Sequence, residues 1–272
     1  MANLKISILN VGHGDFIYST TPLGDNLVID CGNDGGDVTP SKFLASVTII
    51  NELQISHPHT DHFGDIIALS KKNICSFRCP ALENFKDEKI GWRNNDSIKI
   101  AKLRSLKKSI NTDNNAVRCD ANFAHGVYLP SDIDYEDANT SSIVTVLRYG
   151  SFKILFGGDL PDSGWCNLLT NEEFRSAIKG TTIFKVPHHG RSEGCSDELF
   201  KYITPKLCII SDKPIDESNK NTVATSWYSA RTTGIYFGNE LRKVLSTRND
   251  GSIFIDVQLD GNATIYPKTR WQ

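Results

Sequence analysis

The feature that most constrains this chain is the run His57-Pro58-His59-Thr60-Asp61-His62, which places three of its seven histidines within six positions. Clustered imidazoles beside a carboxylate are costly to bury unless a cation binds them, and a divalent metal is the usual occupant. In an extended chain His57 and His59 project to the same side, because side chains alternate with a period of two. Asp61 and His62 follow one turn further on and can point at a second position nearby. The run therefore predicts two metal ions side by side, in preference to a solvated histidine-rich turn.

Three other strand ends carry residues of the same kinds. The segments 26–30, 152–156 and 182–186 are predicted strands that end in Asp30-Cys31-Gly32, Gly157-Gly158-Asp159 and Pro187-His188-His189-Gly190. Polar side chains at strand ends lie at the edge of a sheet, and the adjoining glycines let the backbone approach a ligand closely. Asp30 alone could equally be a turn residue. Together with residues 57–62, these strand ends predict one metal centre assembled from four parts of the chain.

The predicted ligand set favours metal-assisted hydrolysis. Neutral imidazole nitrogens and carboxylate oxygens suit Zn²⁺, and Mn²⁺ or iron also fit, because the set contains no cysteine. Two such ions can lower the pKa of a bridging water toward neutrality, which makes a metal-bound hydroxide available. They also withdraw charge from the oxygens of a carbonyl or phosphoryl group under attack. The residue types do not identify the bond that is cleaved.

Length and composition are those of an ordinary globular protein. The 272 residues, 39% hydrophobic and 23% charged, suit one domain spanning residues 1–272, which we predict. No segment approaches the roughly 20 apolar residues of a membrane span, and no signal-peptide pattern is present. The seven cysteines are scattered and odd in number, which is typical of reduced thiols. We therefore expect a cytoplasmic protein that does not bind a membrane.

Strand and helix patterns recur in both halves of the chain, which suggests two sheets packed face to face with helices outside. The predicted strands are 5–11, 16–20, 26–30, 47–50, 53–56, 143–149, 152–156, 182–186, 206–211, 253–257 and 263–266. The predicted helices are 39–45, 66–70, 96–110, 170–179, 196–203 and, weakly, 239–244. Segment 111–124 is polar and is a predicted loop, and segment 219–234 is also polar. Lysine and arginine side chains cover one face of helix 96–110, which is more typical of a solvated face than of a polyanion site.

The run at 57–62 resembles the His-x-His-x-Asp-His signature of the metallo-β-lactamase superfamily of hydrolases. The strand ends at Asp30, Asp159 and His188-His189 stand in that family's order, and the resemblance spans about residues 4–257. It implies the α+β class and a four-layer αββα sandwich, with two packed mixed sheets and helices outside. It also implies two divalent metal ions at one edge between the sheets.

The resemblance assigns a role to each residue of the predicted centre. The metal ligands would be His57 and His59 at the first ion, Asp61, His62 and His189 at the second, and Asp159 bridging both. His188 is the alternative to His189; we favour His188, with Asp61, as a catalytic residue that contacts substrate or places the water. Asp30 would lie behind the ligands and orient one of them.

Three further segments resemble the hydrolase domain of the ComEC type, the DNA-uptake channel protein, and its stand-alone relatives. They are 10–15, 139–144 and 247–253. True lactamases supply a third histidine to the first metal where this chain has Asn139, and His125 is poorly placed to substitute. Asn139 would therefore lie beside a more open first metal, an arrangement that suits phosphoester oxygens.

The chain departs from the ComEC type after strand 206–211, where that group carries Gly-His-Pro and this chain has residues 214–220. Lys220 or Asn219 would replace the missing substrate contact. Arg191 or Lys185 would counter the charge of a phosphate. We therefore predict a di-metal phosphodiesterase or nuclease acting on nucleic acid or nucleotides. The alternatives are a hydrolase of another ester or amide, and a metal-binding partner module without catalysis.

Overall fold

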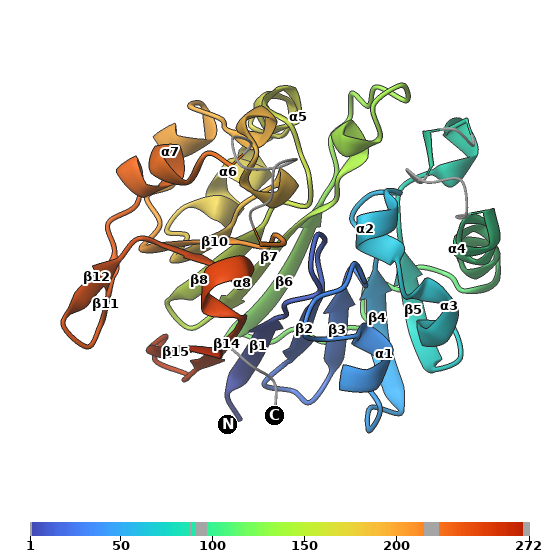
Figure 1. Cartoon of the computed structure of the whole chain (residues 1–272), viewed down its shortest axis with the longest axis horizontal. Helices are drawn as coiled ribbons and strands as arrows, with labels where there is room; N and C mark the ends of the chain where they lie inside the picture. The colour runs from blue at the N-terminus through green and yellow to red at the C-terminus, as the bar shows by residue number, and fades with distance from the viewer. Residues whose placement is uncertain (1, 87–88, 91–96, 215–222, 269–272) are drawn as a thin grey trace.

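Two mixed β-sheets pack face to face at the centre of the structure, and helices cover their outer faces (Figure 1). The computed structural model describes residues 2–86, 89–90, 97–214 and 223–268. One apolar cluster lies between the sheets, and one lies between each sheet and its helices. The expected αββα sandwich is therefore confirmed. Within the described residues, no helix has the length and apolar character that crossing a membrane requires.

The first sheet has seven strands in the order β15-β14-β1-β2-β3-β4-β5. Its strands are β1 (Leu4–Ile8), β2 (Ile17–Thr20), β3 (Asn26–Ile29), β4 (Ile49–Gln54), β5 (Asn73–Arg78), β14 (Ser252–Val257) and β15 (Ala263–Lys268). In β1 alternate residues are apolar, so Leu4, Ile6 and Ile8 all enter the cluster between the sheets. β3, β4 and β5 are parallel, so their carboxyl ends meet at one edge of the sheet.

The second sheet has six strands in the order β13-β10-β9-β8-β7-β6. Its strands are β6 (Phe123–Tyr128), β7 (Val144–Tyr149), β8 (Phe152–Phe156), β9 (Ile183–Lys185), β10 (Leu207–Ile210) and β13 (Val244–Ser246). β8, β9 and β10 are parallel neighbours. Every residue of β10 is buried, as expected of a parallel strand covered on both faces. A separate hairpin pairs β11 (Ile235–Phe237) with β12 (Glu240–Arg242).

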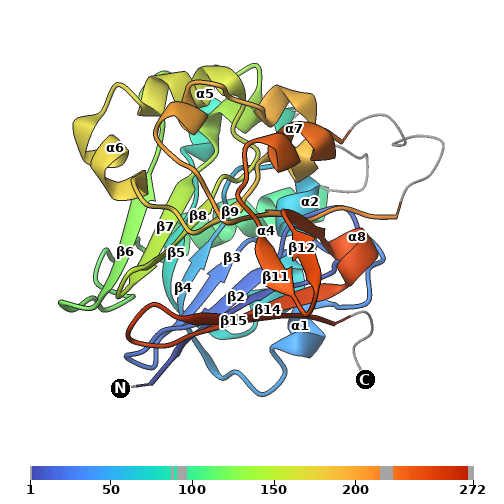
Figure 2. The same cartoon turned by 90° about the vertical axis from the view of Figure 1, so that its left-hand side faces the viewer.

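The helices divide between the two outer faces. The α-helices are α1 (Pro40–Phe43), α2 (Thr60–Phe63), α3 (Ile66–Leu69), α4 (Ser97–Ser109), α5 (Asp162–Leu168), α6 (Glu172–Ile178), α7 (Thr225–Ala230) and α8 (Thr247–Asp250). Short 3₁₀ turns are η1 (Leu82–Asn84), η3 (Ala138–Ser141), η4 (His188–Gly190), η5 (Ser192–Gly194) and η6 (Leu199–Lys201). Residues of α3 and α4 pack in the cluster on the first sheet, and those of α5, α6 and α7 in the cluster on the second. Figure 2 shows α5, α6 and α7 gathered on one side and α1 on the opposite side.

The sequence-based elements agree with the structure except where tertiary pairing overrides local preference. Segment 239–244 has helix-forming residues but contains β12 and leads into β13, because Val244 pairs with Cys208 of β10. Segment 196–203 is wrong as a helix, since only the turn η6 forms there. The sequence did not predict β5, β6, β11, β13, α2, α5, α7 and α8. In α5 a glycine interrupts the apolar pattern, and the buried Trp165 fixes the helix through packing.

Candidate metal centre

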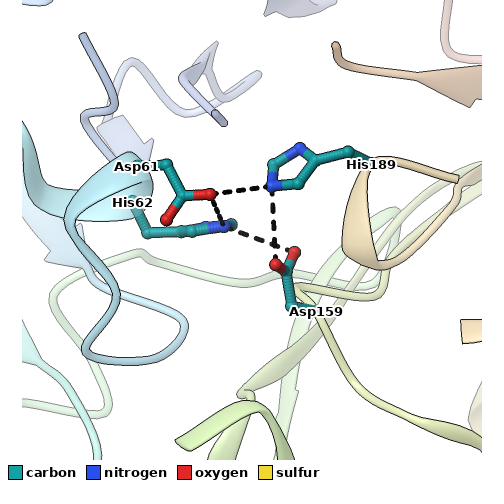
Figure 3. A group of neighbouring side chains, drawn as sticks. All are labelled: Asp61, His62, Asp159 and His189. Carbon is teal, nitrogen blue, oxygen red and sulfur yellow. Dashed lines mark hydrogen bonds and ion pairs between the residues drawn. The ribbon is translucent and has the colours of Figure 1, made fainter. Parts of the chain in front are cut away.

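Four side chains from both sheets converge at the edge where the parallel strands end (Figure 3). Asp61 and His62 lie in α2, which follows β4. Asp159 follows β8, and His189 lies in η4, which follows β9. Their ligand atoms all lie within 4.8 Å of one another. The first sheet therefore supplies two members of this group and the second sheet supplies the other two.

Imidazole nitrogens face carboxylate oxygens throughout the group (Figure 3). His189 Nε2 lies 3.1 Å from Asp61 Oδ2 and 3.4 Å from Asp159 Oδ2. His62 Nε2 lies 3.3 Å from Asp159 Oδ1 and 3.9 Å from Asp61 Oδ2. Each carboxylate thus faces both imidazoles, so the four side chains enclose a common point.

The opposite nitrogen of each ring decides what can occupy that point. His189 Nδ1 lies 3.0 Å from the carbonyl oxygen of Ser211, which can only accept, so Nδ1 carries the hydrogen. His62 Nδ1 donates in the same way to Asp30 Oδ2 at 2.8 Å. In the neutral rings Nε2 is therefore an acceptor that faces acceptors. Among the described residues, none hydrogen-bonds the buried His62 Nε2. A cation satisfies all of these atoms, so the residues fit a divalent metal.

Without a metal, protons take its place. Burial alone would lower the pKa of His189, but Asp159 and Asp61 outweigh burial and raise that pKa to about 10. Burial likewise opposes protonation of His62, yet Asp159, Asp30 and Asp61 hold its pKa well above the usual value. Burial would raise the pKa of Asp159, but the neighbouring imidazoles hold it well below its usual value. A metal binding here must displace protons from the imidazoles.

His57 and His59 form a second pair of imidazoles near Asp159. His57 Nε2 is 3.0 Å from His59 Nδ1 and 3.7 Å from Asp159 Oδ2. Burial, with the charge of His62, lowers the pKa of His57 well below its usual value, so this ring is neutral and able to bind a metal. Asp159 therefore faces His57 as well as His62 and His189, as the predicted bridging role would require.

Asp30 fixes the ligands from behind. Its Oδ1 accepts the Ser56 backbone N–H at 2.7 Å, and its Oδ2 accepts the Ser56 hydroxyl at 2.8 Å as well as His62 Nδ1. The Ser56 hydroxyl also lies 3.2 Å from His57 Nδ1. One buried carboxylate thus orients an imidazole directly and a second one through Ser56.

A pocket of about 270 Å³ opens onto the cluster. Its lining residues are His13, His59, Asp61, Asn139, Asp159, His188, His189 and Arg191. The backbone N–H of His188 donates to Asp159 Oδ1 at 3.1 Å, which leaves the His188 ring on the pocket wall. Asn139 lies in η3, and its buried Oδ1 has no hydrogen-bond partner within the described part of the chain. The metal group is therefore accessible to a small molecule or to part of a larger one.

The backbone is strained at this site. In the described ranges, the residues other than glycine with positive φ are Asp30 at 60°, His188 at 50° and His189 at 51°. Left-handed backbone is unfavourable for residues with a Cβ and tends to occur where function requires it. His188 and His189 line the pocket, and Asp30 holds His62 behind it.

The comparisons with known proteins fit this architecture. No family model matches the chain. The metallo-β-lactamase fold protein YhfI from Bacillus subtilis superposes with a TM-score of 0.53 at 12% identity, and covers 94% of this chain and 100% of that one. The chain has the metallo-β-lactamase fold.

Two curated relatives add a likeness in sequence. A UPF0173 metal-dependent hydrolase from Chloroflexus aurantiacus is 27% identical over 161 residues, which are 57% of this chain and 62% of that protein. Another from Herpetosiphon aurantiacus is 32% identical over 72 residues, which are 26% of this chain and 29% of that protein. The chain therefore matches less than two thirds of the length of either relative.

The metallo-β-lactamase fold brings together the predicted site residues that the structure describes. They are Asp30, His57, His59, Asp61, His62, Asn139, Asp159, His188, His189 and Arg191. Lys220 and Asn219 lie outside the described residues. The interpretation of Lys185 as a phosphate contact is wrong, because its side chain is buried and forms an ion pair with Asp15. Of the residues described, His125 is not among those that line the pocket.

Sequence reasoning missed two residues beside the pocket. His13 lies on its wall, and Asp212, two residues after β10, lies with its Oδ1 3.0 Å from His13 Nδ1. The glycines on either side of His13 indicated a tight turn, but they did not indicate which residues the His13 side chain would contact. A contact between residues 199 positions apart leaves no local pattern in either segment.

Proposed function

We propose that this protein is a metal-dependent hydrolase of phosphodiesters, with nucleic acid or a nucleotide as its substrate and a kinship to the ComEC-type hydrolases. One observation carries the proposal: imidazole Nε2 atoms and carboxylate oxygens face one another around an accessible point, where a metal ion, or protons in its absence, would satisfy them. The names of the two curated relatives, both metal-dependent hydrolases, support the same reaction class.

The chain offers ligands for two ions. The first ion would be held by His57, His59 and Asp159. The second would be held by Asp61, His62 and His189, with Asp159 as a ligand common to both ions. A nitrogen-rich set of this kind suits Zn²⁺, with Mn²⁺ as the alternative. When bound, such ions lower the pKa of water and withdraw charge from phosphoryl oxygens.

The pocket wall favours a phosphoryl substrate. By the resemblance to the lactamases, Asn139 takes the place of a third imidazole ligand of the first ion, and Asn139 lines the pocket, so its amide would leave that side open to substrate oxygens. Among the described residues that line the pocket, Arg191 alone carries a permanent positive charge. A guanidinium suits a phosphate because its N–H groups match the spacing of two phosphate oxygens.

Asp61 and His188 are placed to handle water at the pocket. Asp61 Oδ2 faces the imidazoles, whereas its Oδ1 has no hydrogen-bond partner in the described part of the chain and can accept from a water. Burial lowers the pKa of His188, so its ring is neutral at pH 7 and can accept or donate a hydrogen bond. Both side chains would orient the attacking water or contact the leaving group.

Metal content and hydrolysis by matched variants test the proposal. Purified protein should carry up to two divalent ions per chain and cleave bis(p-nitrophenyl) phosphate. In a second assay it should cleave single-stranded DNA or RNA. Asp159→Ala and His59→Ala should lose metal and turnover while circular dichroism shows a folded protein. Asp162→Ala removes an exposed carboxylate nearby and should leave both unchanged.

Two results would contradict the proposal. Hydrolysis at the native rate by both site variants would show that these residues are not the active site. Metal-loaded protein that cleaves carboxylic esters or amides, but none of the diesters, would refute the phosphodiester substrate and favour the other hydrolase class. A protein that holds both ions and cleaves none of these would be a metal-binding partner module.

A further inference from the structure

His13 approaches the second metal position from the loop between β1 and β2. Its Nε2 lies 3.4 Å from Asp61 Oδ2, and its ring centroid lies 4.2 Å from that of His189. The side chain is 13% exposed and lines the pocket. His13 is thus a fifth imidazole beside the four in the predicted ligand set.

A buried carboxylate holds the far side of the His13 ring. His13 Nδ1 lies 3.0 Å from Asp212 Oδ1, and Asp212 Oδ2 lies 3.4 Å from Arg248 Nη1. Thr247 Oγ1 accepts the Asp212 backbone N–H at 3.0 Å and lies 3.1 Å from the Asp212 carbonyl oxygen. Because the ionised Asp212 can only accept, His13 Nδ1 carries the hydrogen, and Nε2 of the neutral ring presents a lone pair toward Asp61.

The same arrangement recurs at His62 and His189. In each of the three rings Nδ1 is hydrogen-bonded to a protein oxygen behind the ring. Each ring directs its Nε2 toward Asp61 Oδ2, and the distances are 3.9 Å for His62, 3.1 Å for His189 and 3.4 Å for His13. The adjacent residues Ser211 and Asp212 hold two of the rings, His189 through a carbonyl and His13 through a carboxylate. A hydrogen bond behind the ring is the usual support of a metal-binding histidine.

We propose that His13 is a further nitrogen ligand of the second metal, an inference that rests on the proposed function. His13 would be a fifth protein ligand of this ion, so the site would be five-coordinate. With metal–ligand bonds of about 2.1 Å, neighbouring ligand atoms of such a site lie roughly 3.0–3.6 Å apart, a range that includes the 3.4 Å between His13 Nε2 and Asp61 Oδ2. His13 is not in the group whose ligand atoms lie within 4.8 Å of one another, and it approaches from the Asp61 side. Two atoms bound to one ion lie at most about 4.2 Å apart, so the His13 ring must move inward to bind, which makes it the outermost and weakest ligand of that site.

Metal titration of the apoprotein tests this role. Zn²⁺ and Co²⁺ are titrated against a chromophoric chelator into protein stripped with EDTA. His13→Ala should weaken the second metal roughly tenfold to a hundredfold, the range typical of losing one supporting group at a metal site. His13→Gly should regain affinity when free imidazole is added. His125→Gln, which removes a histidine away from the pocket, should bind both ions as the native chain does.

Proton NMR of the Co²⁺ protein separates direct ligation from an indirect effect. An imidazole bound to Co²⁺ gives a strongly shifted, exchangeable N–H signal, so the native chain should show one such signal more than His13→Ala. Two ions bound with native affinity by His13→Ala, and an unchanged number of shifted signals, would overturn the inference and leave the proposed function intact. A native chain that binds no metal would instead refute the proposed function, and this inference with it.

Discussion

The buried ion pair between Lys185 and Asp15 joins the second sheet to the loop between β1 and β2 of the first. Lys185 ends β9 of the second sheet, and its ammonium also donates to the Val186 carbonyl at 3.2 Å. Asp15 lies in the loop after β1, and its backbone N–H donates to the Asp61 carbonyl at 3.3 Å. The two side chains are 1% and 2% exposed, so neither charge is solvated by water.

Lys185→Met should therefore be strongly destabilising. The substitution takes the ammonium away from the buried Asp15 carboxylate, whose Oδ1 already lacks a hydrogen-bond partner among the residues described, and leaves only the His62 imidazole, within 4.8 Å, to offset its charge. Removing one partner of such a pair costs about 3–5 kcal/mol, a large share of the roughly 5–15 kcal/mol by which domains are stable. Asp15→Asn should cost a similar amount, because it leaves Lys185 unpaired. The double variant removes both charges and should cost much less than the sum of the two single variants.

Urea denaturation of metal-free protein, followed by circular dichroism, measures these free energies without a contribution from bound ions. Lys206→Met, at an exposed lysine before β10, is the matched control and should change the free energy of unfolding by about 0.5 kcal/mol or less. Two outcomes would contradict this role of the ion pair. The losses in free energy of unfolding of the two single variants could simply add in the double variant, or the free energy of unfolding of Lys185→Met could lie within about 1 kcal/mol of the native value.

Three further predictions concern the site. In metal-free protein the pKa of His189 is raised to about 10, compared with about 6.5 in the unfolded chain. Protonation of His189 therefore stabilises the folded state fully below about pH 6.5, and this stabilisation is lost as the pH rises through about 10. The free energy of unfolding with EDTA should accordingly fall between pH 7 and 10, and Zn²⁺ binding at pH 7 should release protons, seen as buffer-dependent heats in calorimetry; a flat profile and buffer-independent heats would contradict this. Gly32→Ala would place a Cβ 2.1 Å from the Asp61 carbonyl oxygen, so it should displace Asp61 and lower metal affinity in a chelator titration, and native affinity would show that Asp61 tolerates the shift. Arg191→Ala should raise KM for a phosphodiester roughly tenfold, the loss of about 1.4 kcal/mol from a charge-assisted hydrogen bond, whereas an unchanged KM would exclude Arg191 from substrate binding.

The sequence predicts the parts of this site that depend on short spacing. Two histidines two positions apart, followed by an aspartate and a histidine, predict a metal site from six consecutive residues alone. The strand ends at Asp30 and Asp159 are recognisable because an apolar strand and a glycine bracket each carboxylate. The parallel order of β3 with β4, and of β8 with β9, then brings those ends to one edge.

The contacts that depend on packing between distant segments could not be predicted. His13 and Asp212 each follow an ordinary strand pattern, and only the packing of the two sheets makes them neighbours. The contact of Lys185 is of the same kind. Strand alternation predicts on which face of the sheet its side chain lies, but it does not predict that Asp15 lies opposite that side chain. The residues of 239–244 prefer a helix in isolation, and pairing with β10 overrides that preference.

The left-handed backbone at Asp30, His188 and His189 sets folding stability against activity. Each such residue costs the folded state about 1–2 kcal/mol relative to a conformation that its Cβ prefers. Glycine at these positions would relax the backbone but remove an imidazole or a carboxylate from the site. A laboratory selection that rewarded heat resistance alone would therefore favour substitutions that dismantle the pocket, and only a selection that also required turnover would retain these three side chains.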